Sequence, residues 1–151
     1  MKKVLFILIT TFLFPAVVMA YDKGLTHTKS FHSVKNTADR LEKALREKGV
    51  TIFARINHTD AAKSIGKILR PTELIIFGNP KVGTLLMQCK QTVGIDLPQK
   101  VLIWQDKLGQ VWLTYNTPAY LVKRHGMKGC DKAIHNIDNI LKEITKAATA
   151  K

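Results

Sequence analysis

The sequence lacks the motifs of known catalytic mechanisms. It contains no GxSxG nucleophile motif and no phosphate-binding Walker loop. Its five histidines include no pair separated by three or four residues, the spacing that places two metal ligands on one helix face. Only 11 acidic residues accompany 24 basic ones, so most carboxylates are expected to form surface ion pairs. We therefore predict no catalytic residues, no metal and no cofactor.

Cysteine is scarce, with Cys89 and Cys130 alone, and the two do not form a CxxC redox motif. In an oxidising compartment they can pair, and closing the loop between them would stabilise the fold by about 4 kcal/mol in the chain-entropy model. Two cysteines are also found buried singly, so both alternatives stay open. A redox or stress-related function through this pair is one alternative function of the protein.

Long hydrophobic runs are absent except near the start of the chain. The run from Val4 to Phe14 follows two lysines and is broken by Pro15. These features predict a signal peptide at residues 1–20, cleaved between Ala20 and Tyr21, with an uncleaved N-terminal anchor as the alternative. A membrane span needs about 20 apolar residues, so no span is expected after processing. We expect an exported protein, periplasmic or secreted, with a single domain at residues 21–151.

Positive charge is in excess, with a net charge of +13 for the whole chain. Such an excess favours an anionic small molecule or an envelope surface as a partner, through long-range attraction. The lysines are scattered, however, and form no block of five like charges, which is also typical of an ordinary soluble basic surface. No nucleic-acid reader motif is present, so no nucleic acid is expected.

Alternation and helical spacing of apolar residues predict strands and helices in mixed order. Strands are predicted at residues 26–34, 50–56, 73–77, 101–105 and 111–115, and helices at 36–49, 58–69, 79–91, 118–124 and 131–148. Asn36 or Thr37 is expected to cap the first helix, and the second is expected to bury a stripe containing Ile65, Ile68 and Leu69. The order predicts a single-domain α+β layered sandwich. We expect one mostly antiparallel sheet with helices packed on one face, and a chain that ends in a β-hairpin followed by a C-terminal helix.

The stretch from Leu69 to Met87 carries the first candidate site. Residues 74–77 are four apolar residues without alternation, which favours a strand covered on both faces. Asn79 is a favoured N-cap and is followed by proline at the first helical position. A strand that runs into a helix start aims amides at one spot, where an anion can bind. Ligand-binding candidates here are Asn79, Lys81, Gly83 and Thr84; the alternative is a tight strand–helix joint without a ligand.

Aromatic residues near the hairpin form the second candidate site. Trp104 and Trp112 lie on the two predicted strands of the hairpin, where opposed positions would stack them on one face, and Tyr115, Tyr120 and His125 follow. A groove between this face and the helix of Tyr120 would hold an apolar or aromatic ligand; the alternative is ordinary core or dimer-interface packing. An enzyme of unknown reaction using Tyr115, His125 and Lys81 is a further alternative.

Three runs, LRPTELIIFGNPKVGTLLM, IDLPQKVLIWQD and GQVWLTYNTPAYLVKRHG, closely resemble the bacterial family catalogued as domain of unknown function 302. The resemblance covers residues 33–126, and His58 and the Ala61-Ala62 pair are among the residues that carry it. It implies a compact α+β domain that tends to dimerise, with exported members and no established activity. Cys89 and Cys130 lie outside the family's motif. We therefore expect an exported binding or interaction module that forms a homodimer.

Overall fold

The computed structural model describes residues 24–151. The predicted signal peptide and its cleavage site between Ala20 and Tyr21 lie outside the described residues. Across residues 24–151, no helix combines the length and the hydropathy that a membrane-spanning helix needs. The elements in chain order are β1 (Leu25–Ser30), α1 (Val34–Glu47), β2 (Thr51–Asn57), α2 (His58–Ser64), β3 (Thr72–Gly78), α3 (Pro80–Cys89), the 3-10 helix η1 (Gln91–Ile95), β4 (Gln99–Gln105), β5 (Val111–Asn116), α4 (Pro118–His125) and α5 (Asp131–Thr149).

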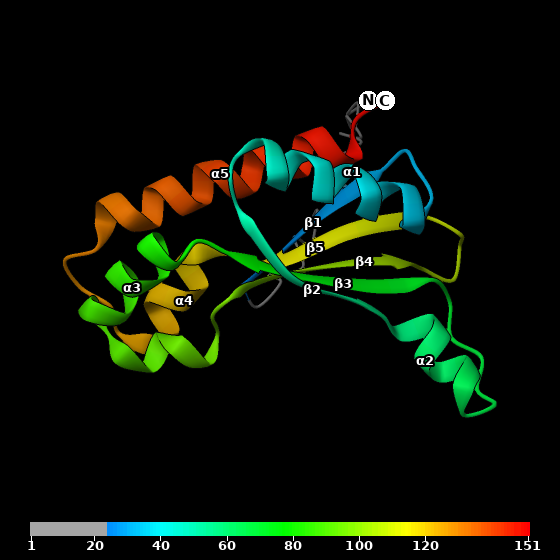
Figure 1. Cartoon of the computed structure of the whole chain (residues 1–151), viewed down its shortest axis with the longest axis horizontal. Helices are drawn as coiled ribbons and strands as arrows, with labels where there is room; N and C mark the ends of the chain where they lie inside the picture. Colours follow the sequence, from blue (N-terminus) through cyan, green and yellow to red (C-terminus); the bar gives the residue numbers. More distant parts are fainter. Residues whose placement is uncertain (1–23) are drawn as a thin grey trace, which may run out of the picture.

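Five strands form one antiparallel sheet in the order β1-β5-β4-β3-β2. Helices α1 and α5 lie side by side over one face of this sheet, α3 and α4 lie at one end, and α2 extends away from the other end (Figure 1). Strands β4 and β5 form the hairpin, and α5 is the C-terminal helix. The predicted α+β domain is therefore confirmed.

The hydrophobic core lies between helices α1 and α5 and the face of the sheet that they cover. Every second residue of β3, β4 and β5 points into it, which follows from the two-residue period of a strand. Burial of each large aliphatic side chain contributes about 1.5–3 kcal/mol to stability. Fully buried members of both layers are Leu41, Leu45, Ile75, Ile103, Leu113, Leu141 and Ile144.

Within residues 24–151, helices cover strand β3 on one face only. Ile75 and Phe77 are buried in the core, whereas Leu74 and Ile76 point to the other side and keep part of their surface exposed. The prediction of a strand covered on both faces is therefore wrong. Four consecutive apolar residues show that both faces of a strand are apolar, but they do not show what covers each face.

Helix α1 begins earlier than predicted. Ser33 is the N-cap, in place of Asn36 or Thr37, and its Oγ accepts a hydrogen bond from the Asn36 amide at 3.2 Å. Thr37 is buried, and its hydroxyl lies 2.7 Å from Ser30 Oγ. Serine at this position satisfies an amide that the first helical turn otherwise leaves without an acceptor.

Helix α2 is shorter than predicted and has no buried residue. It ends at Ser64, and Gly66 turns the chain with a φ of 69°. Ile65, Ile68 and Leu69 expose 72%, 103% and 43% of their surface. The expected buried stripe is therefore wrong, because α2 extends beyond the end of the sheet, where nothing within residues 24–151 covers it (Figure 1).

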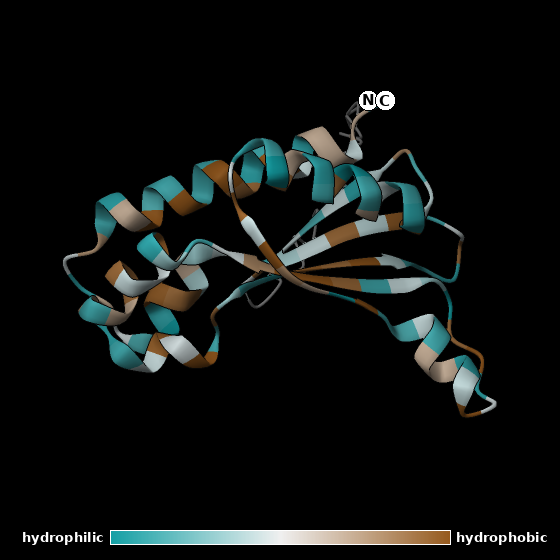
Figure 2. Cartoon of the chain, in the orientation of Figure 1, coloured by the Kyte–Doolittle hydropathy of each residue, from teal (hydrophilic) through white to brown (hydrophobic). Residues whose placement is uncertain are grey.

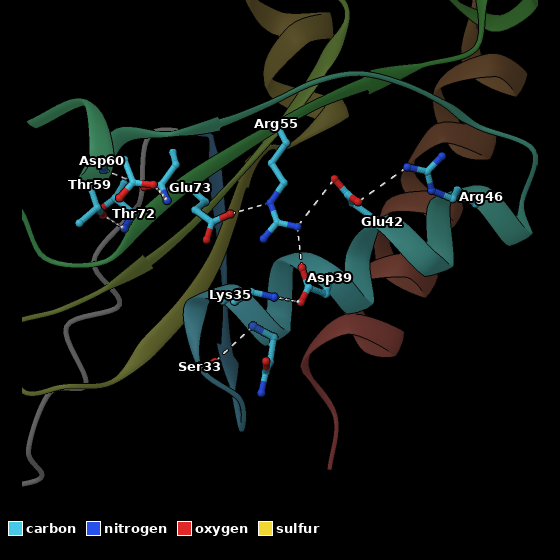
Figure 3. A network of polar contacts seen from close by, with 12 residues as sticks. Ser33, Lys35, Asp39, Glu42, Arg46, Arg55, Thr59, Asp60, Thr72 and Glu73 are labelled. Atoms are coloured by element: carbon cyan, nitrogen blue, oxygen red, sulfur yellow. Dashed lines mark hydrogen bonds and ion pairs between the residues drawn. The ribbon is translucent and has the colours of Figure 1, made fainter. Parts of the chain in front are cut away.

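Arg55 of β2 joins the sheet to α1 (Figure 3). Its Nε donates a hydrogen bond to Glu73 Oε2 and its Nη1 to Asp39 Oδ1, each at 2.6 Å. Glu73 is only 7% exposed, so Arg55 supplies the positive charge that a buried carboxylate requires. Hydrogen bonds from Lys35 and then from Arg55 hold the pKa of the Asp39 carboxyl below its ordinary value.

Replacing Arg55 is expected to destabilise the protein strongly. Arg55→Met leaves the Glu73 carboxylate buried without a counter-charge, which should lower the free energy of unfolding by about 3 kcal/mol in denaturant titrations. Arg46→Met is the matched control, because the exposed Arg46 pairs with Glu42 at 3.7 Å; it should cost under about 1 kcal/mol. The double change Arg55→Met/Glu73→Leu should recover most of the loss. Equal effects of Arg55→Met and Arg46→Met would contradict this interpretation.

Candidate functional site

An apolar pocket of about 290 Å³ lies where β3 ends, β4 begins, and α3 approaches α5. Buried side chains of Phe77, Leu86 and Leu141 form its inner wall. Phe53 and Met87 lie at its mouth, where they are 52% and 37% exposed. A concave, mainly apolar site with few polar groups is the usual form of a small-molecule pocket.

Two glycines help to shape this pocket. A Cβ on Gly78 would lie 3.4 Å from Phe53 Cε2 and 3.5 Å from Pro98 Cβ, so the strand–helix joint is closely packed there. A Cβ on Gly83 would meet only Leu97 Cδ1, at 3.9 Å. The missing side chain of Gly83 therefore leaves part of the pocket's volume empty.

Gln99, the first residue of β4, brings a polar group into the pocket wall. Its side chain points to the core side of the sheet and is 9% exposed, and its Nε2 has no hydrogen-bond partner within the described residues. A buried donor without an acceptor costs about 1–3 kcal/mol, and native proteins leave few of them. Because the Nε2 atom itself is covered, a ligand acceptor can reach it only after the side-chain amide turns.

The start of α3 is a closed helix cap. Asn79 Oδ1 accepts from the Lys81 amide at 2.9 Å, and the Asn79 carbonyl oxygen accepts from the amides of Val82 and Gly83, also at 2.9 Å. Pro80 has no amide hydrogen. No free amide of this first turn is therefore aimed at an anion. Of the predicted residues, Asn79, Gly83 and Thr84 line the pocket. The Lys81 side chain is exposed outside its lining.

The aromatic residues of the hairpin do not form one cluster. Trp104 and Trp112 are cross-strand partners, as expected, on the sheet face away from α1 and α5. Their ring nitrogens donate to Thr114 Oγ1 at 2.8 Å and to Asp106 Oδ2 at 2.9 Å. Tyr115 lies on the opposite face, only 5% exposed, and burial raises the pKa of its phenol. Trp112 and Tyr115 are three residues apart on β5, so their side chains point to opposite faces of the sheet.

His125 joins α4 to η1. Its Nε2 lies 2.6 Å from Asp96 Oδ2, and its Nδ1 lies 3.2 Å from Thr92 Oγ1. Tyr120, on the same helix, accepts a hydrogen bond from Arg124. Neither Tyr120 nor His125 lines the apolar pocket.

The three residues of the enzymatic alternative have different surroundings. Tyr115 lies in the core, His125 packs toward η1, and Lys81 is exposed on α3. Within residues 24–151, no group of three or more His, Cys, Asp or Glu side chains is arranged to hold a metal ion. The pocket at the start of α3 is therefore the better-defined candidate site.

Cys89 and Cys130 form a disulfide, which settles the alternatives left open by their spacing. The bond joins the last residue of α3 to the residue before α5, with a Cα–Cα distance of 6.4 Å. Helix α3 ends at this cysteine and is therefore shorter than the predicted helix at residues 79–91. Leu86 of α3 is buried, whereas Leu85 is 53% exposed and does not face inward. The disulfide thus fixes one end of the two helices that line the pocket.

Sequence reasoning did not identify Phe53 or Gln99 as site residues. Phe53 lies where the pairing register of β2 with β3 shifts, and no local sequence motif predicts that shift. The sequence could have identified Gln99, because it shares a strand face with Val101 and Ile103, both fully buried. A glutamine in that series is a polar residue on a core-facing position.

The model of the family described as domain of unknown function DUF302 matches residues 26–144. The crystal structure of an uncharacterized conserved protein DUF302 from Bacillus stearothermophilus superposes with a TM-score of 0.74 at 18% identity, over 83% of this chain and 98% of that one. This likeness concerns the fold.

Curated relatives cover the same region at higher identity. A protein of Brucella suis biovar 1 named fluoride-specific ion channel FluC 1 is 46% identical over 114 residues, which is 76% of this chain and 45% of that protein. The namesake from Brucella abortus biovar 1 matches at the same identity over 42% of its length. The chain therefore spans less than half the length of these curated relatives.

Replacing Gln99 is expected to stabilise the protein without ligand. Gln99→Met removes the unpaired donor at similar volume, which should raise the free energy of unfolding by about 1 kcal/mol. Gln105→Met is the control, because Gln105 Nε2 donates to the Gly109 carbonyl at 3.1 Å; it should not stabilise. If Gln99→Met destabilises the protein in denaturant titrations, the amide has a partner in solution.

Removing the disulfide is expected to destabilise the protein. The double change Cys89→Ala/Cys130→Ala should lower the free energy of unfolding by about 4 kcal/mol, because the unfolded chain regains the freedom of a long loop. Denaturant titration measures the loss, and reductant should lower the stability of the wild type but not of the variant. An effect of reductant on the variant would show that the disulfide is not its target.

Proposed function

This chain belongs to the family described as domain of unknown function DUF302, and from that premise we propose that it is a non-catalytic binding module for a small, mainly apolar molecule. The pocket of about 290 Å³ at the β3–α3 joint carries the proposal. Its inner wall is formed by buried aliphatic and aromatic side chains, and three of the residues that sequence reasoning selected line it. These are Asn79, Gly83 and Thr84.

The size of the pocket limits the ligand. At about 30 Å³ for each water-sized atom, it holds roughly ten non-hydrogen atoms. The unpaired Gln99 Nε2 favours a ligand with a hydrogen-bond acceptor, such as a carbonyl or hydroxyl oxygen. Pairing that donor would recover free energy that the unliganded protein lacks.

An anionic group on the ligand would remain at the mouth of the pocket. A carboxylate held by one amide deep in an apolar wall would lose most of its hydration, at a high cost. The exposed Lys81 lies on the first turn of α3, next to the pocket-lining Pro80 and Val82. With the net charge of +13, this arrangement supports an amphipathic anion whose apolar part enters the pocket.

We also propose that the protein is an exported homodimer, periplasmic or secreted. The leader-like sequence of residues 1–20 supports export, and so does the disulfide, because disulfides persist in oxidising compartments. The family resemblance supports the dimer. The fluoride specificity in the names of the longer relatives is not carried over to this chain.

Filling the pocket should weaken binding of a small neutral apolar dye such as 1-naphthylamine, whose size matches the roughly ten non-hydrogen atoms that the pocket holds. In Gly83→Phe the new ring occupies the space beside Leu97, so the dye's affinity should fall at least about tenfold. Gln88→Phe is the control, because it adds the same ring to an exposed position of the same helix outside the pocket lining, and it should bind the dye as the wild type does. Fluorescence titration measures both, with circular dichroism to confirm folding.

A second titration tests the anionic part of the ligand. Lys81→Glu should weaken competition by octanoate but not by octanol, because only the carboxylate meets the changed charge. Equal dye binding by wild type and folded Gly83→Phe would contradict the pocket proposal. Equal competition by octanoate in wild type and Lys81→Glu would contradict the anionic group alone.

A further inference from the structure

One face of the sheet has no cover within residues 24–151. Helices α1 and α5 occupy the other face, as Figure 1 shows. We call this side the open face and define it by its large apolar side chains, which are Ile56, Leu74, Ile76, Leu102, Trp104 and Trp112. The register places Ile56 opposite Leu74, and Leu74 opposite Leu102, so these side chains form a continuous row across three strands.

The same chain carries an apolar segment that stays exposed within residues 24–151. The arm, residues 58–70, comprises α2 and the turn after it, and Figure 2 shows hydrophobic residues at its outer end. Ile65 and Ile68 expose 72% and 103% of their surface, although the arm itself is held in place. Thr59 Oγ1 accepts from the Thr72 amide at 2.8 Å, and Arg70 Nε donates to the Gln105 carbonyl at 3.1 Å.

Single exposed aliphatic residues are ordinary, but a gathered apolar patch marks an interaction site. Here two such surfaces occur on one chain, and the arm extends away from the sheet, so it does not cover its own open face (Figure 1). We propose that the arm of each copy lies on the open face of a second copy, around a two-fold axis. Around a two-fold axis, surface A of one copy contacts surface B of the other and the reverse contact occurs as well, so the arm and the open face can pair twice.

The area required by a stable dimer supports the exchange. Five strands about 4.8 Å apart, each about six residues long at about 3.3 Å per residue, give the open face a footprint of roughly 400 Å². A stable interface buries about 800 Å² on each partner. The open face alone is therefore too small, and the reciprocal contribution of the two arms supplies the missing area.

The charges of the two surfaces predict the effect of salt. Lys63 and Lys67 lie on the arm, and Lys29 and Lys100 lie on strands β1 and β4, on the side of the open face. Apolar burial must therefore overcome repulsion between like charges. Salt screens that repulsion, so the proposed dimer should become tighter as ionic strength rises.

The two tryptophans of the chain both lie on the open face, so their fluorescence reports its cover. Wild-type protein should form a dimer in sedimentation experiments, with Trp emission shielded from acrylamide. Ile65→Glu/Ile68→Glu should weaken dimerisation roughly 100-fold and expose both tryptophans, because charge enters the apolar contact. Leu108→Glu is the control: Leu108 is 84% exposed on the β4–β5 turn and should leave dimer and emission unchanged.

This inference rests on the homodimer proposed above, and the experiment separates the two. A wild type that sediments as a monomer at about 100 µM would overturn both the homodimer and the arm exchange. A wild-type dimer that Ile65→Glu/Ile68→Glu leaves intact, or whose dissociation does not change Trp quenching, would overturn the arm exchange alone. The arm residues are exposed in the single chain, so these changes should preserve its fold, which thermal unfolding checks.

Discussion

The burial of one sheet face beneath α1 and α5 is the constraint on which the rest of this structure depends. It fixes the strand alternation of Ile75, Val101 and Ile103 and places Glu73 and Arg55 on the helix side. Because those two helices already occupy the covered face, α3 packs at the end of the sheet, against η1 and the first half of α5. The pocket forms at that corner, where a strand, a short helix and a long helix meet without filling the space between them. In the described part of the chain, the same arrangement leaves the second face of the sheet without helices.

The fold was predictable where local patterns determine it. Cross-strand alternation identified the β4–β5 hairpin, and helical spacing identified α5, because each pattern matches the geometry of a single element. The two main errors have a common cause. Both predictions, for residues 74–77 and for the stripe containing Ile65 and Ile68, infer burial within the chain from apolar character alone. Hydropathy records that a side chain avoids water, but not whether its cover comes from its own chain.

The candidate site was predictable in part, for a related reason. The Asn79–Thr84 segment carries its own signals, a cap, a proline and two small residues, and these remain adjacent after folding. Other parts of the wall include Phe53, Gln99 and Leu141, which only the tertiary fold brings to this corner. The proposed aromatic cluster failed on strand geometry that the sequence already contained, because Trp112 and Tyr115 are three residues apart and must face opposite sides.

The disulfide has a consequence for how a molecule enters the pocket. It pins the C-terminal end of α3 to the start of α5, whereas the N-terminal end of α3 follows the Gly78–Asn79–Pro80 joint. Both ends of α3 are therefore held, the C-terminal end by the disulfide and the N-terminal end by strand β3 of the sheet. A molecule that enters the pocket therefore meets a wall of fixed position as long as the disulfide is oxidised, and reduction would release only the C-terminal end of α3.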